Sequence, residues 1–396
     1  MIRSKSEFQT AIIGGGAAGL AAAISAGRAG HSAVICERMP RLGKKVLISG
    51  GGRCNLLNEK FHASSYSSSC PELVRSVLNR FGKIKILNFF KELGLKVCSE
   101  EGRLFPVTNQ ASSVVKILEL ELARLQVGVE LNFEVAELGT SPAGFSLIAK
   151  DGRRVESQKV ILAGGGRSYP ALGSDGNAYR LAERLGHRKI DPVPSAVPLV
   201  IKDRWCHLLQ GQRIISKVKS LIGGSVVGEA SGEVLFTQHG LSGTAILDVS
   251  ESISIAVHRD KKETVGVSLD LIPYLSDEEL TDELARRASH GFKEEDLLTG
   301  LLPNKLAGLA WEELKAGSRG LKDKRFRVLG TRGWNEAEFT CGGIDARDVE
   351  VRTLESKCQR GLYLAGEILD VQGPRGGYNL GWAWASGYVA GLTEQT

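Results

Sequence analysis

The stretch from Phe8 to Asn55 constrains the fold most, because short apolar runs, glycines and an acid follow one another there in a fixed order. The apolar run 10–13 predicts a buried strand, and the small-residue run 17–29 predicts a helix. A second apolar run, 32–36, predicts a strand that ends on Glu37. Strand, helix and strand in this order predict a βαβ unit.

The turn between the first strand and the helix has G-x-G-x-x-G spacing. Gly14 allows the tight turn, Gly16 lets a pyrophosphate approach the backbone, and Gly19 lets the helix lie close to the sheet. The first helical residues, Ala17 and Ala18, present free N–H groups and the positive end of the helix dipole to a phosphate.

Glu37 stands 18 residues after Gly19, at the end of the second predicted strand. A carboxylate at this point accepts hydrogen bonds from a ribose and disfavours a ribose that carries a 2′-phosphate. The flanking strand, helix and acid therefore favour a dinucleotide-binding unit over a chance glycine-rich turn.

The composition limits the class of protein. Seven cysteines are scattered without a C-x-x-C pair, which argues against a metal site and against a redox disulfide. Isolated cysteines are typical of a reducing cytosol, so we expect a cytoplasmic protein. No apolar run approaches the roughly 20 residues that a membrane helix needs. The net charge of +6 permits a polyanionic partner without requiring one.

After Glu37, residues 38–58 are predicted to form a long loop. Lys44 and Lys45 are placed in it to meet phosphate or ribose oxygens. The run SGGGRCN (49–55) has too little side chain to build a core, and its backbone N–H groups can form an anion-binding concavity. A flexible linker is the alternative, but the apolar residues just before the run favour an anchored loop.

The middle of the chain contains a second glycine-rich strand end. Helices are predicted over 72–93 and 112–125, a loop at 103–106, and strands over 128–131 and 133–138. A predicted hairpin, 145–149 and 155–162, then leads to Ala163, Gly164, Gly165 and Gly166. An apolar strand that ends in glycines indicates that a ligand or another part of the backbone approaches the chain closely there.

The chain changes character around residues 191–194. Strand-like segments follow at 197–201, 212–219, 225–228, 233–237, 245–249 and 264–271. Helical segments come next, and Ser276 with Glu279 predicts a capping box. We therefore predict an inserted domain that covers the cofactor and carries substrate contacts. The predicted boundaries are 1–195 and 336–396 for the first domain and 196–335 for the inserted one, β-rich over 196–275 and helical over 276–330.

The last part of the chain returns to the first domain. An apolar strand within 360–369 ends on Gly366 and Glu367, and the turn 376–380 opens a final helix over 381–392. With glycine-rich sites in this order, the sequence resembles the two-dinucleotide-binding-domain flavoproteins. More narrowly, it resembles the YhiN/BaiN-like group, which includes aminoacetone oxidase-like proteins. The motifs that carry the resemblance are GGGAAGLAAA (14–23), KKVLISGGGRCN (44–55), VILAGGGRSYPALGSDGNAYRLAERLGH (160–187), GEVLFTQHGLSGTAILDVS (232–250) and LAGEILDVQGPRGGYNLGWAWASGYVAG (364–391).

The resemblance implies an α/β fold, in which a discontinuous Rossmann-like FAD-binding domain holds an inserted β-barrel-like plus helical domain. It implies non-covalent FAD, with the Val135 backbone at the adenine and the C-terminal glycine-rich turn near the flavin. A helix that begins at such a turn stabilises negative charge on a reduced flavin. The residues that we expect to bind FAD are Gly14, Gly16, Ala17, Ala18, Gly19, Glu37, Arg38, Lys44, Lys45, Gly51, Gly52, Arg53, Asn55, Val135, Ala163, Gly164, Gly366, Glu367, Asn379 and Leu380.

The function that the resemblance implies is an FAD-dependent oxidoreductase acting on a C–C or C–N bond of a small molecule. The sequence has no second G-x-G-x-x-G, so NAD(P)H, the expected electron donor, would visit the open flavin face transiently. An RNA-directed flavoprotein that changes the uridine/dihydrouridine oxidation state in ribosomal RNA is the alternative. A Lys/Arg face drawn from Arg204, Arg213, Lys217 and Lys219 would support it. A non-catalytic FAD-binding regulator is a third hypothesis.

The catalytic acid or base stays open at the level of sequence. His239 follows a predicted strand and is one candidate, with a histidine that caps the next turn as the alternative. Tyr169 and Tyr378 flank glycine-rich loops, where they either wall the flavin or pack in the core. The sequence also leaves open the substrate, the direction of the reaction and the oligomeric state.

Overall fold

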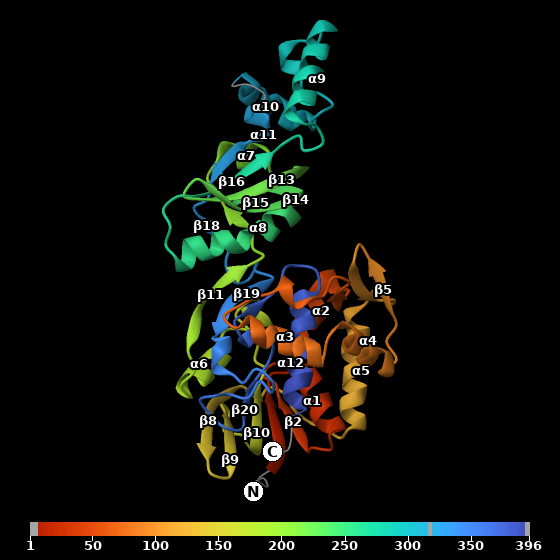
Figure 1. Cartoon of the computed structure of the whole chain (residues 1–396), viewed down its shortest axis with the longest axis vertical. Coiled ribbons are helices and arrows are strands. Elements are labelled where there is room, and N and C mark those ends of the chain that lie inside the picture. The colour runs from red at the N-terminus through yellow and green to blue at the C-terminus, as the bar shows by residue number, and fades with distance from the viewer. Residues whose placement is uncertain (1–6, 316–318, 393–396) are drawn as a thin grey trace. The chain divides into compact units, whose positions relative to one another are not determined.

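The computed structural model describes residues 7–315 and 319–392, so the ends of the predicted first domain, 1–6 and 393–396, lie outside the described residues. The chain divides into two compact units (Figure 1). Unit 1 comprises Met1–Pro192 and Phe339–Thr396, and unit 2 comprises Val193–Glu338.

Unit 1 is built on a mainly parallel sheet in the order β7-β2-β1-β10, with β20 also paired to β10 and the antiparallel strands β9 and β8 continuing the edge. This is the predicted Rossmann-type α/β arrangement. The strands are β1 (Glu7–Ile13), β2 (Ala33–Cys36), β7 (Gly128–Glu130), β8 (Val135–Ser141), β9 (Gly144–Ala149), β10 (Arg154–Leu162) and β20 (Leu362–Leu364).

The parallel strands form because their apolar runs are buried on both faces of the sheet. Ile12 and Ile35 are fully buried, and the register places Ile12 opposite Ile35 and Ile161. Helices α1 (Ala17–Arg28) and α12 (Tyr378–Gly391) pack against each other in this core. Their backbones approach so closely that a Cβ atom on Gly387 would overlap the Ala18 carbonyl oxygen.

The remaining elements of unit 1 form a second layer and several short sheets. The helices are α2 (Lys44–Gly52), α3 (Pro71–Arg80), α4 (Lys83–Glu92), α5 (Ala111–Arg124) and α6 (Asn177–Arg184). The short strands are β3 (Leu57–Asn58), β4 (Ser67–Ser68), β5 (Val97–Glu100), β6 (Arg103–Pro106), β19 (Phe339–Ile344) and β21 (Val371–Gln372). Strand β11 (Lys189–Ser195) runs across the division between the units.

Three local predictions in unit 1 are wrong. The segment 38–58 is not one loop, because 44–48 form a helical turn before the backbone leaves the helix at Ser49 (ψ 144°) and enters the left-handed region at Gly50 (φ 58°). The predicted helix 72–93 is two helices, since Phe81 (φ −140°) is not helical and a side chain on Gly82 would overlap the Leu78 carbonyl. Residues 103–106, predicted as loop, are strand β6, which pairs with β5.

Unit 2 contains an antiparallel seven-stranded sheet in the order β17-β16-β13-β14-β15-β12-β18. The strands are β12 (Leu199–Val200), β13 (Arg213–Ile222), β14 (Ser225–Thr237), β15 (Gly240–Ser242), β16 (Val265–Asp270), β17 (Lys324–Arg327) and β18 (Gly330–Thr331). The helices are α7 (Arg204–Leu208), α8 (Thr244–Ser254), α9 (Asp277–Ser289), α10 (Asn304–Lys315) and α11 (Arg319–Lys322).

Three predictions for the secondary structure of unit 2 are also wrong. The predicted strand 245–249 lies in helix α8, because Gly243 (φ 95°) redirects the chain and Ala245, Ile246 and Val249 are then buried at helical spacing. The two strands predicted at 225–228 and 233–237 are one continuous strand, β14. The predicted helical part, 276–330, ends too late, since β17 pairs with β16 through alternating buried and exposed residues.

The predicted capping box at the start of α9 is confirmed. The Glu279 backbone N–H donates to Ser276 Oγ at 3.1 Å, and the Ser276 N–H donates to Glu279 Oε2 at 2.7 Å. Both partners therefore satisfy amide groups that a helix N-terminus would leave unpaired.

The contact between α1 and α12 leads to a stability prediction. Gly387→Ala should destabilise unit 1 by about 1–3 kcal/mol, because the added methyl overpacks the helix contact. Gly308→Ala, in the exposed interior of α10 where a Cβ atom meets nothing within 4 Å, is the matched control and should stabilise by about 0.5–1 kcal/mol. Thermal unfolding followed by circular dichroism measures both, and equal effects of the two substitutions would contradict this account of the contact.

Candidate functional site

The G-x-G-x-x-G turn of unit 1 forms an open cradle. Gly14 has φ 105°, and a Cβ atom on it would lie 2.6 Å from the Ala163 carbonyl oxygen. A Cβ atom on Gly19 would overlap the Gly14 carbonyl, whereas one on Gly16 would meet nothing within 4 Å. No side chain caps the N-terminus of α1. The N–H groups of its first turn are therefore left for an anion such as a pyrophosphate.

Glu37 is held at the edge of this cradle. Its carboxylate accepts hydrogen bonds from the backbone N–H groups of Gly15 at 2.5 Å and Met39 at 2.7 Å, and the residue is 8% exposed. Burial raises the pKa of Glu37, although the two backbone N–H groups oppose that shift. The acid at the end of β2 thus orders the glycine turn and lies where a ribose of a dinucleotide is expected.

Lys45 and Glu367 form the electrostatic centre of the site. Lys45 Nζ lies 2.7 Å from Glu367 Oε2 and 2.8 Å from Ser168 Oγ. Glu367 Oε1 also accepts the Thr340 N–H at 2.9 Å. Burial raises the pKa of Glu367, but Lys45 and the backbone N–H groups of Thr340 and Gly166 lower it further, so the carboxylate stays ionised.

This cluster joins four segments that are far apart in sequence: α2, the glycine-rich loop after β10, the start of β19 and the 3₁₀ turn 366–368. Lys45 and Glu367 are among the residues predicted from the sequence, whereas Ser168 and Thr340 are not. Ser168 lies two residues after Gly166, the last glycine of the second glycine-rich strand end, and this position was the one signal that could have identified it.

The glycine-rich turn of α2 meets the C-terminal glycine-rich turn. Gly51 (φ 68°) would meet nothing within 4 Å if it carried a Cβ atom, so its backbone is open. When the oxygen and nitrogen of its side-chain amide are exchanged, Asn55 accepts a hydrogen bond from Gly377 N at 3.2 Å and donates one to Leu57 O at 3.1 Å. Arg53 forms an ion pair with Glu100 at 2.7 Å. Gly52 lies between Gly51 and Arg53 and also has a positive φ, 86°.

The C-terminal residues expected near the flavin contact α12 or the turn that precedes it. Gly366 (φ 82°) donates its N–H to Ser386 Oγ at 2.9 Å and accepts from Trp382 Nε1 at 3.1 Å. Asn379 closes the preceding turn with two hydrogen bonds to the Gly373 backbone, both at 2.9 Å. Leu380, next in the helix, is partly buried. No side chain caps α12, so its first N–H groups can face negative charge.

Other expected FAD contacts are already engaged with protein groups. Arg38 forms ion pairs with Asp175 at 2.7 Å and Glu134 at 3.2 Å. The Val135 carbonyl accepts from Asn177 Nδ2 at 3.0 Å, which anchors the start of α6 to β8. Ala163 and Gly164 form the close contacts of the second glycine-rich strand end, with Gly164 packed against Ala178 and Ala163 against Gly14. Lys44 is half-buried at the start of α2, and Ala17 and Ala18 are buried in the first turn of α1.

The two catalytic candidates lie in different units. His239, in the turn between β14 and β15 of unit 2, has an exposed ring with Nε2 3.0 Å from Gln238 Nε2. Tyr169 of unit 1 adopts a left-handed backbone, φ 55° and ψ 64°, which is uncommon for an aromatic residue. Tyr378 packs with Phe61 and Tyr66 at the start of α12, and its hydroxyl donates to Asn58 Oδ1 at 3.2 Å.

The Lys/Arg residues expected to mark an RNA-binding face are largely paired with acids. Arg213 lies 2.7 Å from Glu233, and Lys217 lies 2.9 Å from Glu229 on the next strand. Lys219 approaches Glu229 at 4.0 Å, and Arg204 is exposed on α7. Residues 193–338 carry 19 Lys and Arg against 21 Asp and Glu. Unit 2 therefore has no basic excess, and the +6 net charge comes from unit 1.

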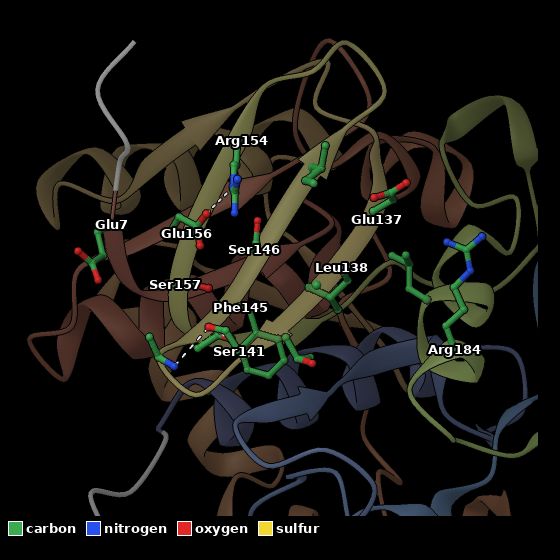
Figure 2. Close-up of a pocket in the computed structure, with 16 residues that line it drawn as sticks. Glu7, Glu137, Leu138, Ser141, Phe145, Ser146, Arg154, Glu156, Ser157 and Arg184 are labelled. Atoms are coloured by element: carbon green, nitrogen blue, oxygen red, sulfur yellow. Dashed lines mark hydrogen bonds and ion pairs between the residues drawn. The ribbon is translucent and has the colours of Figure 1, made fainter. Parts of the chain in front are cut away.

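A separate hollow of about 570 Å³ lies on the β8-β9-β10 part of unit 1 and α6. Figure 2 shows Ser146 and the paired Arg154 and Glu156 in it. None of the residues expected to bind FAD lines this hollow. In the part of the chain that the structure describes, no group of three His, Cys, Asp or Glu side chains is placed to hold a metal, and no helix is long and apolar enough to cross a membrane.

Taken together, the cradle at Gly16, the ordered Glu37, the ionised Lys45–Glu367 pair and the uncapped α12 fit FAD. The pyrophosphate would face the N-terminus of α1, and the ribose would face Glu37. The reduced flavin would lie near the positive end of α12.

Comparison with known proteins gives matches along nearly the whole chain. The model of the HI0933-like protein Rossmann domain matches residues 8–393. A 3-dehydro-bile acid delta(4,6)-reductase from Clostridium scindens is 38% identical, over 96% of this chain and 97% of the relative. A ribosomal RNA dihydrouridine synthase from Haemophilus influenzae is 31% identical, over 96% of this chain and 97% of the relative.

Solved structures share the fold at low sequence identity. The 3-ketosteroid-Δ4-(5α)-dehydrogenase from Rhodococcus jostii RHA1 matches with a TM-score of 0.53 and 15% identity, over 99% of this chain and 98% of that chain. The 3-ketosteroid Δ1-dehydrogenase from Sterolibacterium denitrificans matches with a TM-score of 0.54 and 11% identity, over 98% of this chain and 99% of that chain.

The geometry of Glu37 predicts its effect on cofactor affinity. Glu37→Gln should weaken FAD binding by about 10- to 100-fold, because hydrogen bonds to a charged group contribute about 1.5–3 kcal/mol. Titration of the FAD-free protein, followed by quenching of flavin fluorescence, measures the dissociation constant. Glu119→Gln on α5 is the matched control and should leave it unchanged. An unaltered dissociation constant for Glu37→Gln would show that the Glu37 carboxylate does not contribute to FAD binding.

The Lys45–Glu367 pair predicts energetic coupling in the FAD-free protein. Lys45→Met should be the more destabilising single change, because it leaves the Glu367 carboxylate with neutral donors only. Lys45→Met, Glu367→Gln and the double variant should give a coupling energy of about 0.5–3 kcal/mol in urea unfolding. Lys44→Met is the control, since Lys44 forms no ion pair with a described residue. If the changes in unfolding free energy of Lys45→Met and Glu367→Gln simply add in the double variant, the two side chains do not interact.

Proposed function

The chain belongs to the HI0933-like family of Rossmann-domain proteins and is an FAD-dependent oxidoreductase; we propose that it reduces an electron-poor carbon–carbon double bond of a small molecule with electrons from NAD(P)H. The observation that carries the proposal is the joined site of unit 1. In that site the Lys45–Glu367 ion pair joins α2 to the 3₁₀ turn 366–368, whose Gly366 is hydrogen-bonded to Trp382 and Ser386 of α12.

The names of the two curated relatives describe one kind of chemistry. A Δ4 double bond in a 3-dehydro-bile acid is conjugated with the ketone, and the double bond that becomes saturated in dihydrouridine is conjugated with a ring carbonyl. In both cases the carbonyl withdraws electrons, so the distant carbon of the double bond accepts a hydride. We therefore assign the reducing direction, and we place a small conjugated carbonyl compound first because the bile acid reductase is 38% identical.

The residues of this chain contribute binding and electrostatics. FAD supplies the hydride chemistry when it is bound. The N-terminus of α12 would stabilise the negative charge that grows on the flavin when it is reduced, and Lys45 adds a cation beside Glu367. Because the chain has one G-x-G-x-x-G motif, NAD(P)H would use the open flavin face and leave before the substrate enters. The seven cysteines all lie in the described part of the chain and none forms a disulfide, which fits the reducing cytoplasm that we propose as the location.

Reduction of uracil in ribosomal RNA is the second candidate. It is supported by the 31% identical dihydrouridine synthase and by the basic excess of unit 1. The paired residues of unit 2, Arg213, Lys217 and Lys219, give it no support.

Anaerobic stopped-flow mixing tests the electron donor. Mixing the yellow holoenzyme with NADPH or NADH should bleach the visible flavin absorption. A 3-oxo-Δ4 steroid added afterwards should restore the colour and gain two hydrogens by mass spectrometry. Absence of bleaching by both nucleotides would contradict the NAD(P)H-linked reductase, and a protein that takes up no FAD would contradict the cofactor assignment. A colour that returns only with uridine-containing RNA would favour the second candidate.

A further inference from the structure

We propose that an exposed basic surface of unit 1 binds the phosphate backbone of RNA and leads it to the flavin end of the site. The surface, here called the α4 basic surface, is formed by the exposed Lys60, Lys85 and Arg103 and the half-buried Lys83. This inference deepens the second candidate substrate and rests on the proposed flavin chemistry.

The α4 basic surface is continuous in the structure. Lys83 Nζ donates to the Glu59 carbonyl at 2.7 Å, which joins α4 to the turn after β3. The Glu59 N–H donates to the Gly102 carbonyl at 2.8 Å, which joins that turn to the tip of the β5-β6 hairpin. Lys85 Nζ donates to the Arg80 carbonyl at 2.7 Å, at the junction of α3 and α4. All these residues belong to unit 1, so their mutual placement is defined.

The positive charge of this surface is poorly compensated. The ammonium groups of Lys83 and Lys85 bond to carbonyl oxygens, and neither forms an ion pair with a described carboxylate. Residues 59–103 carry eight Lys and Arg against five acids. Two of these acids are engaged by arginines outside the segment, Glu92 with Arg28 at 2.9 Å and Glu100 with Arg53 at 2.7 Å. Uncompensated cations spread over a surface are the pattern that neutralises successive phosphates.

One end of the surface touches the cofactor site. A Cβ atom on Gly376 would lie 3.7 Å from Arg103 Nε and 3.4 Å from Asn58 Nδ2, and Asn58 donates to the Gly376 carbonyl at 2.9 Å. Gly376 belongs to the turn that opens α12, where the flavin is expected. An RNA strand held along α4 would therefore bring a nucleotide to the flavin end. Ile84, which is 73% exposed between the two lysines, offers apolar contact to an unstacked base.

The experiment compares two triple variants of the FAD-loaded enzyme that each remove three positive charges. Lys60→Gln, Lys83→Gln and Lys85→Gln together alter the α4 basic surface. Arg213→Gln, Lys217→Gln and Lys219→Gln together alter the acid-paired face of β13 and serve as the matched control. The probe is a fluorescein-labelled, uridine-rich single-stranded RNA of about 20 nucleotides, long enough to cover a typical single-strand site. Fluorescence anisotropy is recorded from 50 to 200 mM KCl.

The wild-type enzyme should bind the probe with a steep salt dependence. The α4 variant should lose about 2 from the logarithmic salt slope, at about 0.7 per single-strand phosphate contact, and bind at least about tenfold more weakly at 100 mM KCl. The β13 variant should bind like the wild type. Flavin content and bleaching by NADPH should be normal in both variants, since none of the six residues is expected to contact FAD.

The inference would be overturned if the wild type bound no RNA at 50 mM KCl, or if the two variants weakened RNA binding equally. With vesicles that contain phosphatidylglycerol as a second probe, binding to the vesicles and not to the RNA would also overturn it. These results would leave the reductase function standing if NADPH still bleaches the flavin. Conversely, RNA binding that depends on the α4 basic surface in an enzyme that NADPH does not reduce would uphold the inference and contradict the proposed electron donor.

Discussion

The close backbone contact between Gly14 and Ala163 is the constraint on which the rest of unit 1 depends. It brings two glycine-rich strand ends together at the carboxyl edge of β1 and β10, whose residues pair in parallel register from Glu7 to Ile13. A side chain at Gly14 would separate these strand ends. The same edge then places the N-terminus of α1 and the loop that carries Ser168 on one side of the sheet, where a ligand of an α/β fold is expected.

Electrostatic contacts then connect this edge to segments from the far ends of the sequence. Glu367 comes from the last sixth of the chain, yet its carboxylate accepts from Lys45 of α2 and from the Thr340 backbone. An ionised carboxylate with this many donors costs little to keep charged, although it is largely removed from water. The Lys45–Glu367 ion pair thus ties α2 to the 3₁₀ turn 366–368, and each of its two members satisfies a charge that would otherwise need solvent.

The sequence predicted those parts of the fold whose physics is local. The βαβ unit could be predicted because glycine spacing, helix start and the acid at position 37 act within about thirty residues. The strand predicted at 245–249 failed because a short apolar run fits strand and helix equally, and the choice depends on Gly243 and on burial against the sheet of unit 2. The helix break at Phe81–Gly82 likewise depends on a close contact with Leu78.

The candidate site shows the same limit. Glycines and Glu37 could be identified from spacing, but Ser168 and Thr340 acquire a role only through tertiary contacts with Lys45 and Glu367. The location of a basic surface is the hardest feature to predict, because a net charge of +6 does not say where on the molecule the cations lie. The residues first expected to form a basic face alternate along β13 and meet Glu229 and Glu233 across the strand pair, so their charges cancel. The lysines of α4 instead donate to backbone carbonyls, Lys83 to Glu59 in the turn after β3 and Lys85 to Arg80 at the end of α3, and there the charge remains available to a polyanion.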